Sequence, residues 1–479
     1  MKNVLDHSFA FEKHFEEMTR IPHGSYNEKQ YSDYIVEFAK KHNLECKQYE
    51  VGNVIVYKPG TVGYENKEPV VLQSHMDMVC EKDMDSNIDF EVDPLELYIE
   101  EGFIKAKGTT LGADNGVGVA YMLSILESND IPHPPLECIF TVQEEVGCGG
   151  AKEIDPEDIQ GKVMIGLDDC GGVTTYIASA GGMTITLNKQ IANCPVCAND
   201  NGFKLNISGL LGGHSGTAIH KERGNSIKVA ARLLMKLGSF GSVKISSFEG
   251  GLKENVIPKY CEVLFVSELQ PEQVSEIINI ETERIKKELE FSDNGLVVNV
   301  ETFQIDESLD SDDSIKLIEI LTLLPNGLKH SSVEIEGLSV ASENIGIIKV
   351  AEGNVEIVAS LRGALESYID ELYSEYEILA KLFGFDIYIN SRYPAWEYVK
   401  QSKTREMLVE KYKEVTGKDL DFIAVHGGLE CGFIKEKFPE IDIVTLGPLI
   451  LDEHTTDESL NISSFHEIFE VLKKMLKDF

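Results

Sequence analysis

The sequence predicts an α/β domain with a mixed sheet flanked by helices, interrupted by an inserted α+β domain. In the first third of the chain and near its C-terminus, short apolar strands alternate with helices, and most of these strands end on acidic residues or histidine. Between them, apolar and polar residues alternate strictly, as in sheets with one covered face. We therefore predict a catalytic domain of residues 1–185 plus 386–479 and an inserted domain of residues 186–385.

Length and charge narrow the classes of protein. A chain of 479 residues exceeds one ordinary core, so two or three domains are expected. The 44 basic and 81 acidic side chains give a net charge of −37, which repels nucleic acid and anionic membranes and otherwise favours solubility. No apolar run approaches the ~20 residues of a membrane helix, and the N-terminus does not resemble a signal peptide. Nine cysteines without a disulfide framework fit a reducing compartment, so we predict a cytoplasmic protein.

Apolar periodicity predicts the elements of the catalytic domain in chain order. Helices are expected within residues 5–42, with a break at 21–24, and an apolar helix follows a glycine-rich turn. This helix is expected at residues 117–126. Strands are expected at residues 53–57, 70–74, 136–142 and 163–167, and a loop with a small hairpin at 81–105.

The middle and the end of the chain are predicted in the same way. In the inserted domain, strands with alternating polarity are expected around residues 183–187, 203–207 and 355–361. Its helices are expected around residues 225–237, 272–290 and 314–323. The α/β pattern is expected to resume at 386–389 and continue through 441–446. A final helix carries an apolar stripe that begins at Phe465, and either Asn461 or Ser463 caps it.

Five candidate metal ligands follow the predicted strands or the glycine-rich turn: His75, Asp114, Glu145, Asp168 and His454. Two imidazoles and three carboxylates suit two divalent ions, zinc first, with manganese or cobalt possible. If Asp114 bridges ions ~3.5–4 Å apart, a water between them is activated for attack on a carbonyl. Glu144 is then the candidate general base, and Asp77 is placed to hold the imidazole of His75.

Each part of this pattern also has a plainer interpretation. His75 and Asp77 alone are typical of a surface or structural pair, and Glu144 with Glu145 of a solvated acidic turn. The stretch Ala113-Asp114-Asn115-Gly116 alone favours a turn before an N-capped helix. The combination is much less expected by chance than any one part.

The motifs VLQSHMDMV, KGTTLGADNGVGVA, TVQEEVGCGG, GLLGGHSG and GPLILDEHTTDESL, with the strand ending at Asp168, closely resemble the aminoacyl-histidine dipeptidase branch of the M20 zinc metallopeptidases, nearly end to end. The resemblance implies a zinc-peptidase catalytic domain interrupted by a lid or dimerisation domain, and a homodimer. It implies one zinc on His75, Asp114 and Asp168, and another on Asp114, Glu145 and His454. Glu144 would be the base and Asp77 the residue that orients His75. It also implies a cis peptide bond at Asp114-Asn115.

Further residues follow from the same resemblance. His214 would stabilise the oxyanion, from its own or a partner subunit; an exposed histidine in a tight glycine turn is the plainer alternative. Four residues match positions that would hold the ends of the substrate: Asn255, Asn344, Arg362 and His426. Arginine pairs with a carboxylate through two parallel hydrogen bonds. A structural role is the plainer alternative for each of the four.

The sequence therefore predicts a metal-dependent dipeptidase that hydrolyses unblocked dipeptides, including Xaa-His, with broad specificity. The main alternative is an amidohydrolase that cleaves N-acylated amino acids with the same metal centre. A non-catalytic metal- or peptide-binding protein on this scaffold is expected to have lost the base or a ligand, whereas Glu144 and all five candidate ligands are present.

Overall fold

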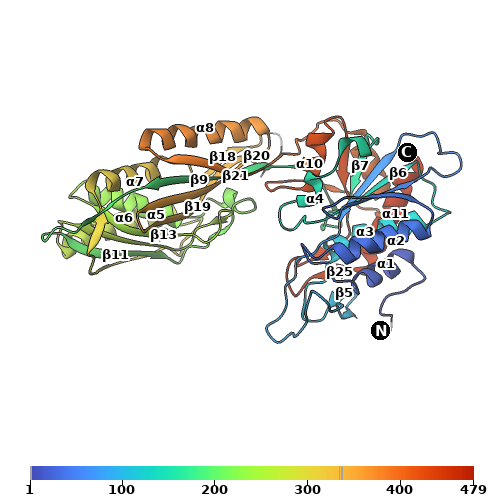
Figure 1. The fold of residues 1–479 in the computed structure, drawn as a ribbon, viewed down its shortest axis with the longest axis horizontal. Coiled ribbons are helices and arrows are strands. Elements are labelled where there is room, and N and C mark those ends of the chain that lie inside the picture. The colour runs from blue at the N-terminus through green and yellow to red at the C-terminus, as the bar shows by residue number, and fades with distance from the viewer. Residues whose placement is uncertain (1–2, 334, 336–337) are drawn as a thin grey trace. The chain divides into compact units, whose positions relative to one another are not determined.

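The computed structural model describes residues 3–333, 335 and 338–479, and these form two compact units (Figure 1). The first unit consists of Met1–Ala178, Tyr398–Ala424 and Leu429–Phe479, and the second of Ser179–Glu397 and Val425–Gly428. The chain thus leaves the first unit and returns to it. The boundaries lie several residues from the predicted ones at 185/186 and 385/386.

The first unit is built on a mixed sheet with the strand order β1-β2-β6-β3-β7-β23. Strands β6, β3, β7 and β23 run parallel, whereas β1 and β2 are antiparallel. All six residues of β3 are buried, as expected of an interior strand covered on both faces. The strands are β1 (Glu45–Gln48), β2 (Val54–Lys58), β3 (Val70–His75), β6 (Leu136–Thr141), β7 (Val163–Gly166) and β23 (Asp442–Thr445).

Helices cover this sheet, with α3 on β3 and α9 on β23, while α1 packs on α3 and α11 on α9. The helices are α1 (Ala10–Met18), α2 (Lys29–Lys41), α3 (Ala113–Glu127), α4 (Gly149–Lys152), η1 (Pro156–Asp158), α9 (Lys403–Thr416), α10 (Glu430–Lys437) and α11 (Ile462–Asp478). Small sheets are formed by β4 (Leu97–Glu100), β5 (Phe103–Ala106), β24 (Ile450–Leu451) and β25 (Ser459–Asn461), and by β8 (Thr174–Ser179) with β22 (Asp421–Val425).

Helix α3 is buried nearly all round, which confirms the prediction from its apolar sequence. It starts four residues earlier than predicted, and Asp114 and Asn115 inside it have non-helical backbone angles. A side chain at Gly118 would place its Cβ 2.6 Å from Ser74 Oγ and 2.8 Å from Leu167 Cβ, so only glycine allows this approach. The start of α3 is therefore held directly against the ends of β3 and β7.

The second unit contains a large antiparallel sheet with the order β16-β11-β15-β13-β19-β20-β9-β21, and β18 pairs with β19. Buried and partly exposed residues alternate along β11, as predicted for a strand with one covered face. The strands are β9 (Gly181–Gln190), β11 (Asn201–Ser208), β13 (Lys244–Gly250), β15 (Cys261–Ser267), β16 (Val297–Thr302), β18 (Gly327–Ser331), β19 (Ser339–Ala351), β20 (Asn354–Gly363) and β21 (Asp386–Tyr393).

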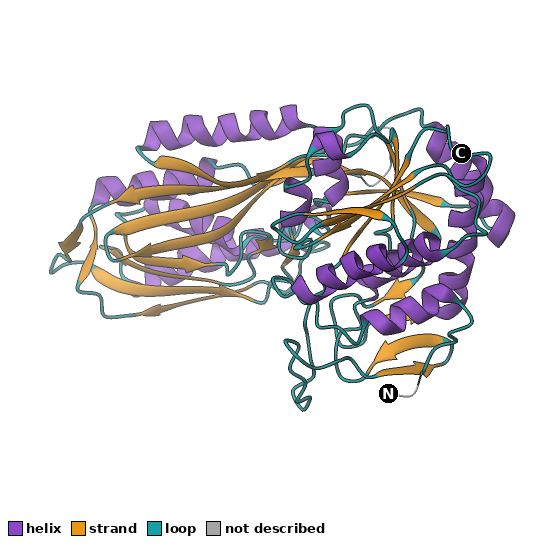
Figure 2. Ribbon diagram, turned by 45° about the vertical axis from the view of Figure 1, so that its right-hand side comes forward, coloured by secondary structure: helices purple, strands orange, loops and turns teal. Residues whose placement is uncertain are grey.

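Helices pack along this sheet (Figure 2). They are α5 (Ser226–Gly238), α6 (Pro271–Glu288), α7 (Ser311–Leu323) and α8 (Glu366–Phe383), with a short η2 (Ile219–Lys221). Two short pairs complete the unit: β10 (Asn193–Pro195) with β17 (Glu307–Leu309), and β12 (Gly213–His214) with β14 (Val256–Ile257).

The predicted return to the α/β domain at Asp386 is wrong. Strand β21 pairs antiparallel with β9 at the edge of the large sheet, and the chain rejoins the first unit only at Tyr398. Most residues of β21 are exposed. A short run of alternating residues shows that a strand forms, but not which sheet it joins.

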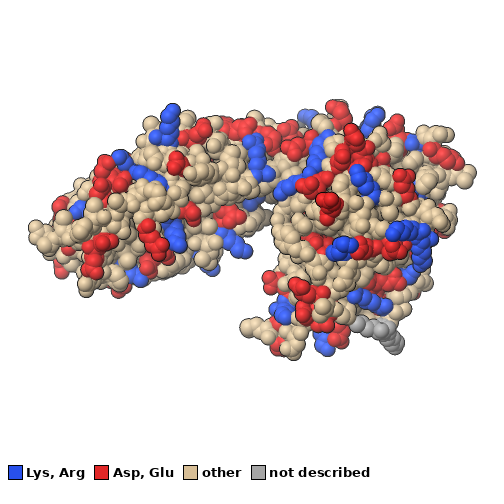
Figure 3. Space-filling view, viewed as in Figure 1, with Lys and Arg blue, Asp and Glu red and all other residues tan. Residues whose placement is uncertain are grey.

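Acidic side chains are spread over both units on the face drawn in Figure 3. None of the helices in the described part of the chain is long and apolar enough to cross a membrane.

The final helix, α11, is capped at its N-terminus by one of the two predicted residues. Asn461 is its N-cap, and the side-chain oxygen of Asn461 accepts a hydrogen bond from the Ser464 amide at 2.9 Å. We expect Asn461→Ala to lower the free energy of unfolding by ~1 kcal/mol in urea titration, because one amide of the first turn loses its partner. The matched Ser463→Ala change should cost less than ~0.5 kcal/mol. Equal losses in both variants would contradict the assignment.

Candidate active site

Three parallel strands bring the predicted residues to one edge of the sheet. Strand β3 ends on His75, which pairs in register with Thr141 at the end of β6, and Gln73 pairs with Gly166 at the end of β7. Because parallel strands end on the same side, the residues that follow β6 and β7 emerge beside His75. These are the pair Glu144 and Glu145, and Asp168.

Asp114 lies between the two candidate imidazoles. Its Oδ1 is 3.0 Å from His75 Nε2, and its Oδ2 is 3.3 Å from His454 Nε2. Glu145 Oε1 is 3.0 Å from the same His454 nitrogen. Each oxygen of Asp114 thus faces a different histidine, as a carboxylate that bridges two cations requires.

Asp168 completes the set of five predicted ligands, and its Oδ1 lies 3.8 Å from His75 Nε2. The side chain of Asn115 donates to this Oδ1 at 2.8 Å and accepts from Ser74 Oγ at 2.7 Å. The peptide bond between Asp114 and Asn115 is cis, as the resemblance implies. The donor atoms of His75, Asp114 and Glu145 lie within 4.8 Å of one another.

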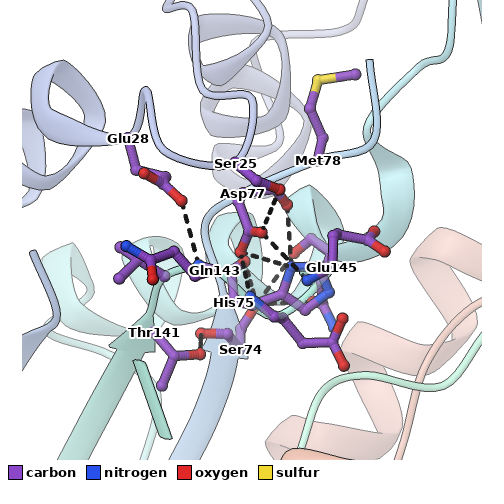
Figure 4. A network of polar contacts seen from close by, with 12 residues as sticks. Ser25, Glu28, Ser74, His75, Asp77, Met78, Thr141, Gln143 and Glu145 are labelled. Atoms are coloured by element: carbon purple, nitrogen blue, oxygen red, sulfur yellow. Dashed lines mark hydrogen bonds and ion pairs between the residues drawn. The ribbon is translucent and has the colours of Figure 1, made fainter. Parts of the chain in front are cut away.

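Asp77 holds His75 mainly through its backbone. His75 Nδ1 is 2.9 Å from the Asp77 carbonyl oxygen and 3.6 Å from its carboxylate Oδ1. That carboxylate accepts hydrogen bonds from the Glu144 and Glu145 amides and from Ser25 Oγ (Figure 4). A proton on Nδ1 leaves Nε2 as the free ligand atom, so Asp77 fixes both the histidine tautomer and the turn that carries the two glutamates.

The electrostatics of this edge favour a cation. Burial alone would lower the pKa of His75, but the hydrogen bond to Asp114, the Asp77 carboxylate 3.6 Å away and the charge of Asp168 raise it well above its usual value. Hydrogen bonds to Asp114 and Glu145 raise the pKa of His454 to about 11. The negative charge of the carboxylates therefore exceeds the positive charge of the histidines at this edge. This mixture of nitrogen and oxygen donors fits divalent ions such as zinc.

Glu144, the candidate base, is next in sequence to the candidate ligand Glu145. Its amide donates to Asp77 Oδ1 at 3.0 Å, and its Oε1 is 3.6 Å from Cys148 Sγ. Burial raises the pKa of the Glu144 carboxyl well above its usual value, and the charges of Asp168 and Glu430 raise it further. The charge of His75 acts in the opposite direction. A raised pKa makes the carboxylate a stronger proton acceptor, which suits a general base.

Glu458 is a site residue that the sequence reasoning missed. Its carboxylate accepts hydrogen bonds from the four consecutive amides of residues 111–114, at 2.6, 3.0, 2.8 and 3.3 Å. It thereby fixes the turn that presents Asp114. The residue stands within the motif DEHTTDESL, but a sequence does not show which amides a carboxylate meets.

We expect Glu458→Gln to weaken metal binding by ~10–100-fold, the usual effect of losing a group that orients a ligand. The amide can still accept but carries no charge, and its NH₂ would face backbone donors. Chelator competition measures the affinity. The neighbouring, exposed Asp457→Asn is the control, and an unchanged affinity in Glu458→Gln would show that the turn holds without this carboxylate.

Glu430, also missed, is a buried carboxylate behind the site. It accepts hydrogen bonds from Gln73 Nε2 at 2.5 Å and Thr141 Oγ1 at 2.6 Å, whereas its Oε1 has no partner among the described residues. Burial raises the pKa of Glu430 to about 7. It ties the start of α10 to β3 and β6, next to the end of β3 that presents His75.

The other predicted residues belong to the second unit, where His214, Arg362 and His426 lie near one another. Burial and then the charge of Arg362 lower the pKa of His214, and the same two causes lower that of His426 to about 3. His214 Nδ1 accepts from the amides of Gly216 and Thr217 at 3.3 and 3.4 Å, so Nε2 carries the proton. His426 Nε2 is 2.7 Å from Ser342 Oγ.

Arg362 and the two asparagines differ in how much of each side chain is already bonded. Arg362 donates to Tyr393 Oη at 2.7 Å, and its buried Nε has no partner within the described chain. Asn344 donates to the carbonyls of Glu254 and Val256, both at 2.9 Å, so its amide holds the segment around Asn255. The Arg362 guanidinium thus keeps a free donor, whereas the amide nitrogen of Asn344 is used structurally.

This fold and this set of donors define a metal-dependent peptidase. A sequence profile of Peptidase family M20/M25/M40 matches residues 71–478, and the chain therefore belongs to this family. The protein is a hydrolase of peptide bonds, and the predicted family and fold class are confirmed.

Individual relatives refine the comparison. The chain is 34% identical over 466 residues to the cytosol non-specific dipeptidase of Escherichia coli K12, covering 97% of this chain and 96% of that protein. The crystal structure of aminoacylhistidine dipeptidase from Vibrio alginolyticus superposes with a TM-score of 0.90 at 32% identity, covering 98% and 96% of the two chains. Aminopeptidase PepT from Bacillus cereus shares the fold, with a TM-score of 0.56 at 18% identity and 98% of both chains covered.

Proposed function

We propose that this protein is a dipeptidase that removes the N-terminal residue of unblocked dipeptides, Xaa-His among them, with broad specificity. The observation that carries the proposal is the placement of Asp114 between His75 and His454, with Glu144 free of that arrangement. Similarity to relatives named for dipeptide hydrolysis over nearly the whole chain supports this substrate class.

His75, Asp114, Glu145, Asp168 and His454 are proposed to hold two divalent ions, zinc first and manganese or cobalt as alternatives. When bound, such ions polarise the peptide carbonyl and lower the pKa of a water molecule. Glu144 would take the proton of the attacking water on its carboxylate and pass it to the leaving amine. Asp77 would keep His75 Nε2 directed at the centre through the contact of its carbonyl with Nδ1.

The cluster in the second unit is proposed to bind the substrate itself. His214 presents an Nε2–H donor suited to a developing oxyanion. The unpartnered Nε of Arg362 suits the substrate's carboxylate. Asn255, Asn344 and His426 are proposed as further contacts with the ends of the dipeptide, Asn344 through its Oδ1, which has no partner within the described residues.

The test is amine release from a panel of unblocked dipeptides by zinc- or manganese-loaded protein, with N-acetyl amino acids alongside. We expect turnover of the unblocked dipeptides only, and its loss after chelation. Turnover of the acetylated compounds alone would assign the protein to the amidohydrolases. Two bound ions without any turnover would instead indicate a binding protein.

We further propose a cytoplasmic homodimer in which the second unit acts as a lid or dimerisation domain. The nine cysteines are all unpaired, which fits a reducing compartment. Light scattering of the purified protein at several concentrations gives the mass, and a mass of one chain throughout would contradict the dimer.

A further inference from the structure

Cys170 and Glu453 lie beside the candidate metal centre, and none of the roles above uses them. Their donor atoms and that of Asp114 lie within 4.8 Å of one another. The donor atoms of His75, Asp114 and Glu145 form a second group of this kind, and Asp114 belongs to both. In the part of the chain that the structure describes, no further group of three such donors is this close.

The main chain fixes the position of Cys170. The Ile450 amide donates to the Cys170 carbonyl at 2.9 Å, which joins the segment after β7 to the loop that carries Glu453. A Cβ at Gly447 would lie 1.6 Å from the Asp169 carbonyl oxygen, so this close approach requires glycine. The thiol is therefore held next to the loop by backbone contacts, independently of any cation.

The two groups differ in their chemistry. His75, Asp114 and Glu145 offer nitrogen and oxygen atoms, which zinc, cobalt and manganese all accept. Cys170 adds a sulfur, a soft donor that zinc and cobalt accept readily, whereas manganese and magnesium favour oxygen. A thiol in this position would bias the centre towards one class of metal.

We propose that Cys170 and Glu453 are additional ligands of the second ion, which is the one expected on Asp114, Glu145 and His454. We further propose that Cys170 makes the centre selective for zinc or cobalt over manganese. The inference rests on the metal centre of the proposed function. The alternative is a half-buried thiol that only makes a hydrogen bond to the Glu453 carboxylate.

Cobalt binding tests the proposal without an activity assay. A thiolate bound to Co²⁺ gives an intense charge-transfer absorption in the near ultraviolet, which nitrogen and oxygen ligands do not give. We expect this band when metal-free protein is titrated with Co²⁺, and its loss in Cys170→Ser. Cys46→Ser is the matched control, because Cys46 is another half-buried thiol, on β1, and it should keep the band.

Two further measurements sharpen the result. Glu453→Gln should retain the band but lower the affinity for the second ion by about tenfold or more. In Cys170→Ser, competition between Zn²⁺ and Mn²⁺ should shift towards manganese. Circular dichroism and binding of the first ion show whether each variant is folded.

A wild-type measurement makes the test independent of any variant's folding. Zn²⁺ should protect Cys170 from alkylation by iodoacetamide, as followed by mass spectrometry. Equal alkylation with and without Zn²⁺, or two bound Co²⁺ ions without the charge-transfer band, would overturn the proposal. A band that persists in Cys170→Ser would also overturn it.

The outcomes separate this inference from the proposed function. If the band depends on Cys170 but the protein hydrolyses no dipeptide, Cys170 is supported as a ligand and the proposed dipeptidase function is contradicted. Dipeptide hydrolysis by a protein with two ions and no thiolate band does the reverse.

Discussion

Glu144→Gln is expected to reduce kcat for dipeptide hydrolysis by ~10²–10⁴-fold, the usual contribution of a general base. The amide is nearly isosteric but cannot accept a proton from the attacking water. The backbone amide of Glu144, which donates to Asp77 at 3.0 Å, stays in place. Metal content should therefore remain near that of the unmodified protein, which distinguishes loss of the base from collapse of the site.

Steady-state kinetics on one unblocked dipeptide, with metal analysis of the same sample, checks this prediction. Glu153→Gln is a suitable control, because Glu153 is exposed at the end of α4, outside the cluster of donors. It should leave kcat unchanged. Near-normal kcat in Glu144→Gln with full metal content would exclude Glu144 as the base and direct attention to Glu430, the buried carboxylate behind the site.

Asp114→Asn is expected to impair both metal positions at once. Its two oxygens lie 3.0 and 3.3 Å from the two histidines, so replacing one oxygen by NH₂ removes an acceptor and the bridging charge together. The loss of metal affinity should exceed the ~10–100-fold expected for Glu458→Gln, which acts only through orientation. Metal analysis after dialysis and isothermal titration measure the loss.

Stability gives a second measure of the same change. An ion that binds only the folded state stabilises it by ~2.7 kcal/mol at a concentration one hundred times its Kd. Added Zn²⁺ should raise the Tm of the unmodified protein and of the exposed Asp85→Asn control, but much less that of Asp114→Asn. Two ions bound with unchanged affinity in Asp114→Asn would show that this carboxylate does not bridge them.

Much of the first unit was predictable because its signals are local. The strand that ends on His75, the apolar helix after the glycine-rich turn and the strand before Glu144 are each encoded within a few neighbouring residues. Parallel strands with polar residues after their last positions then predict one common edge. This edge is where the structure gathers His75, Asp114, Glu145, Asp168 and His454.

The return point of the chain was not predictable in the same way. Residues 386–393 show that a strand forms, but pairing with β9 depends on a partner some two hundred residues earlier. Sequence alternation gives the face that a strand buries and not its neighbour. The predicted boundary at 385/386 therefore fell at the start of β21, whereas the chain rejoins the first unit only at Tyr398.

The sequence by itself determined the family, the mixed α/β architecture and the residue types of the candidate two-metal centre, because motif order and spacing carry that information. Only the tertiary structure revealed that Glu458 binds the amides of residues 111–114, and that Asp77 acts on His75 mainly through its carbonyl. It alone placed Cys170 beside Asp114 and Glu453. Contacts of this kind join residues far apart in the chain, and they arise from main-chain geometry and burial that no local pattern encodes.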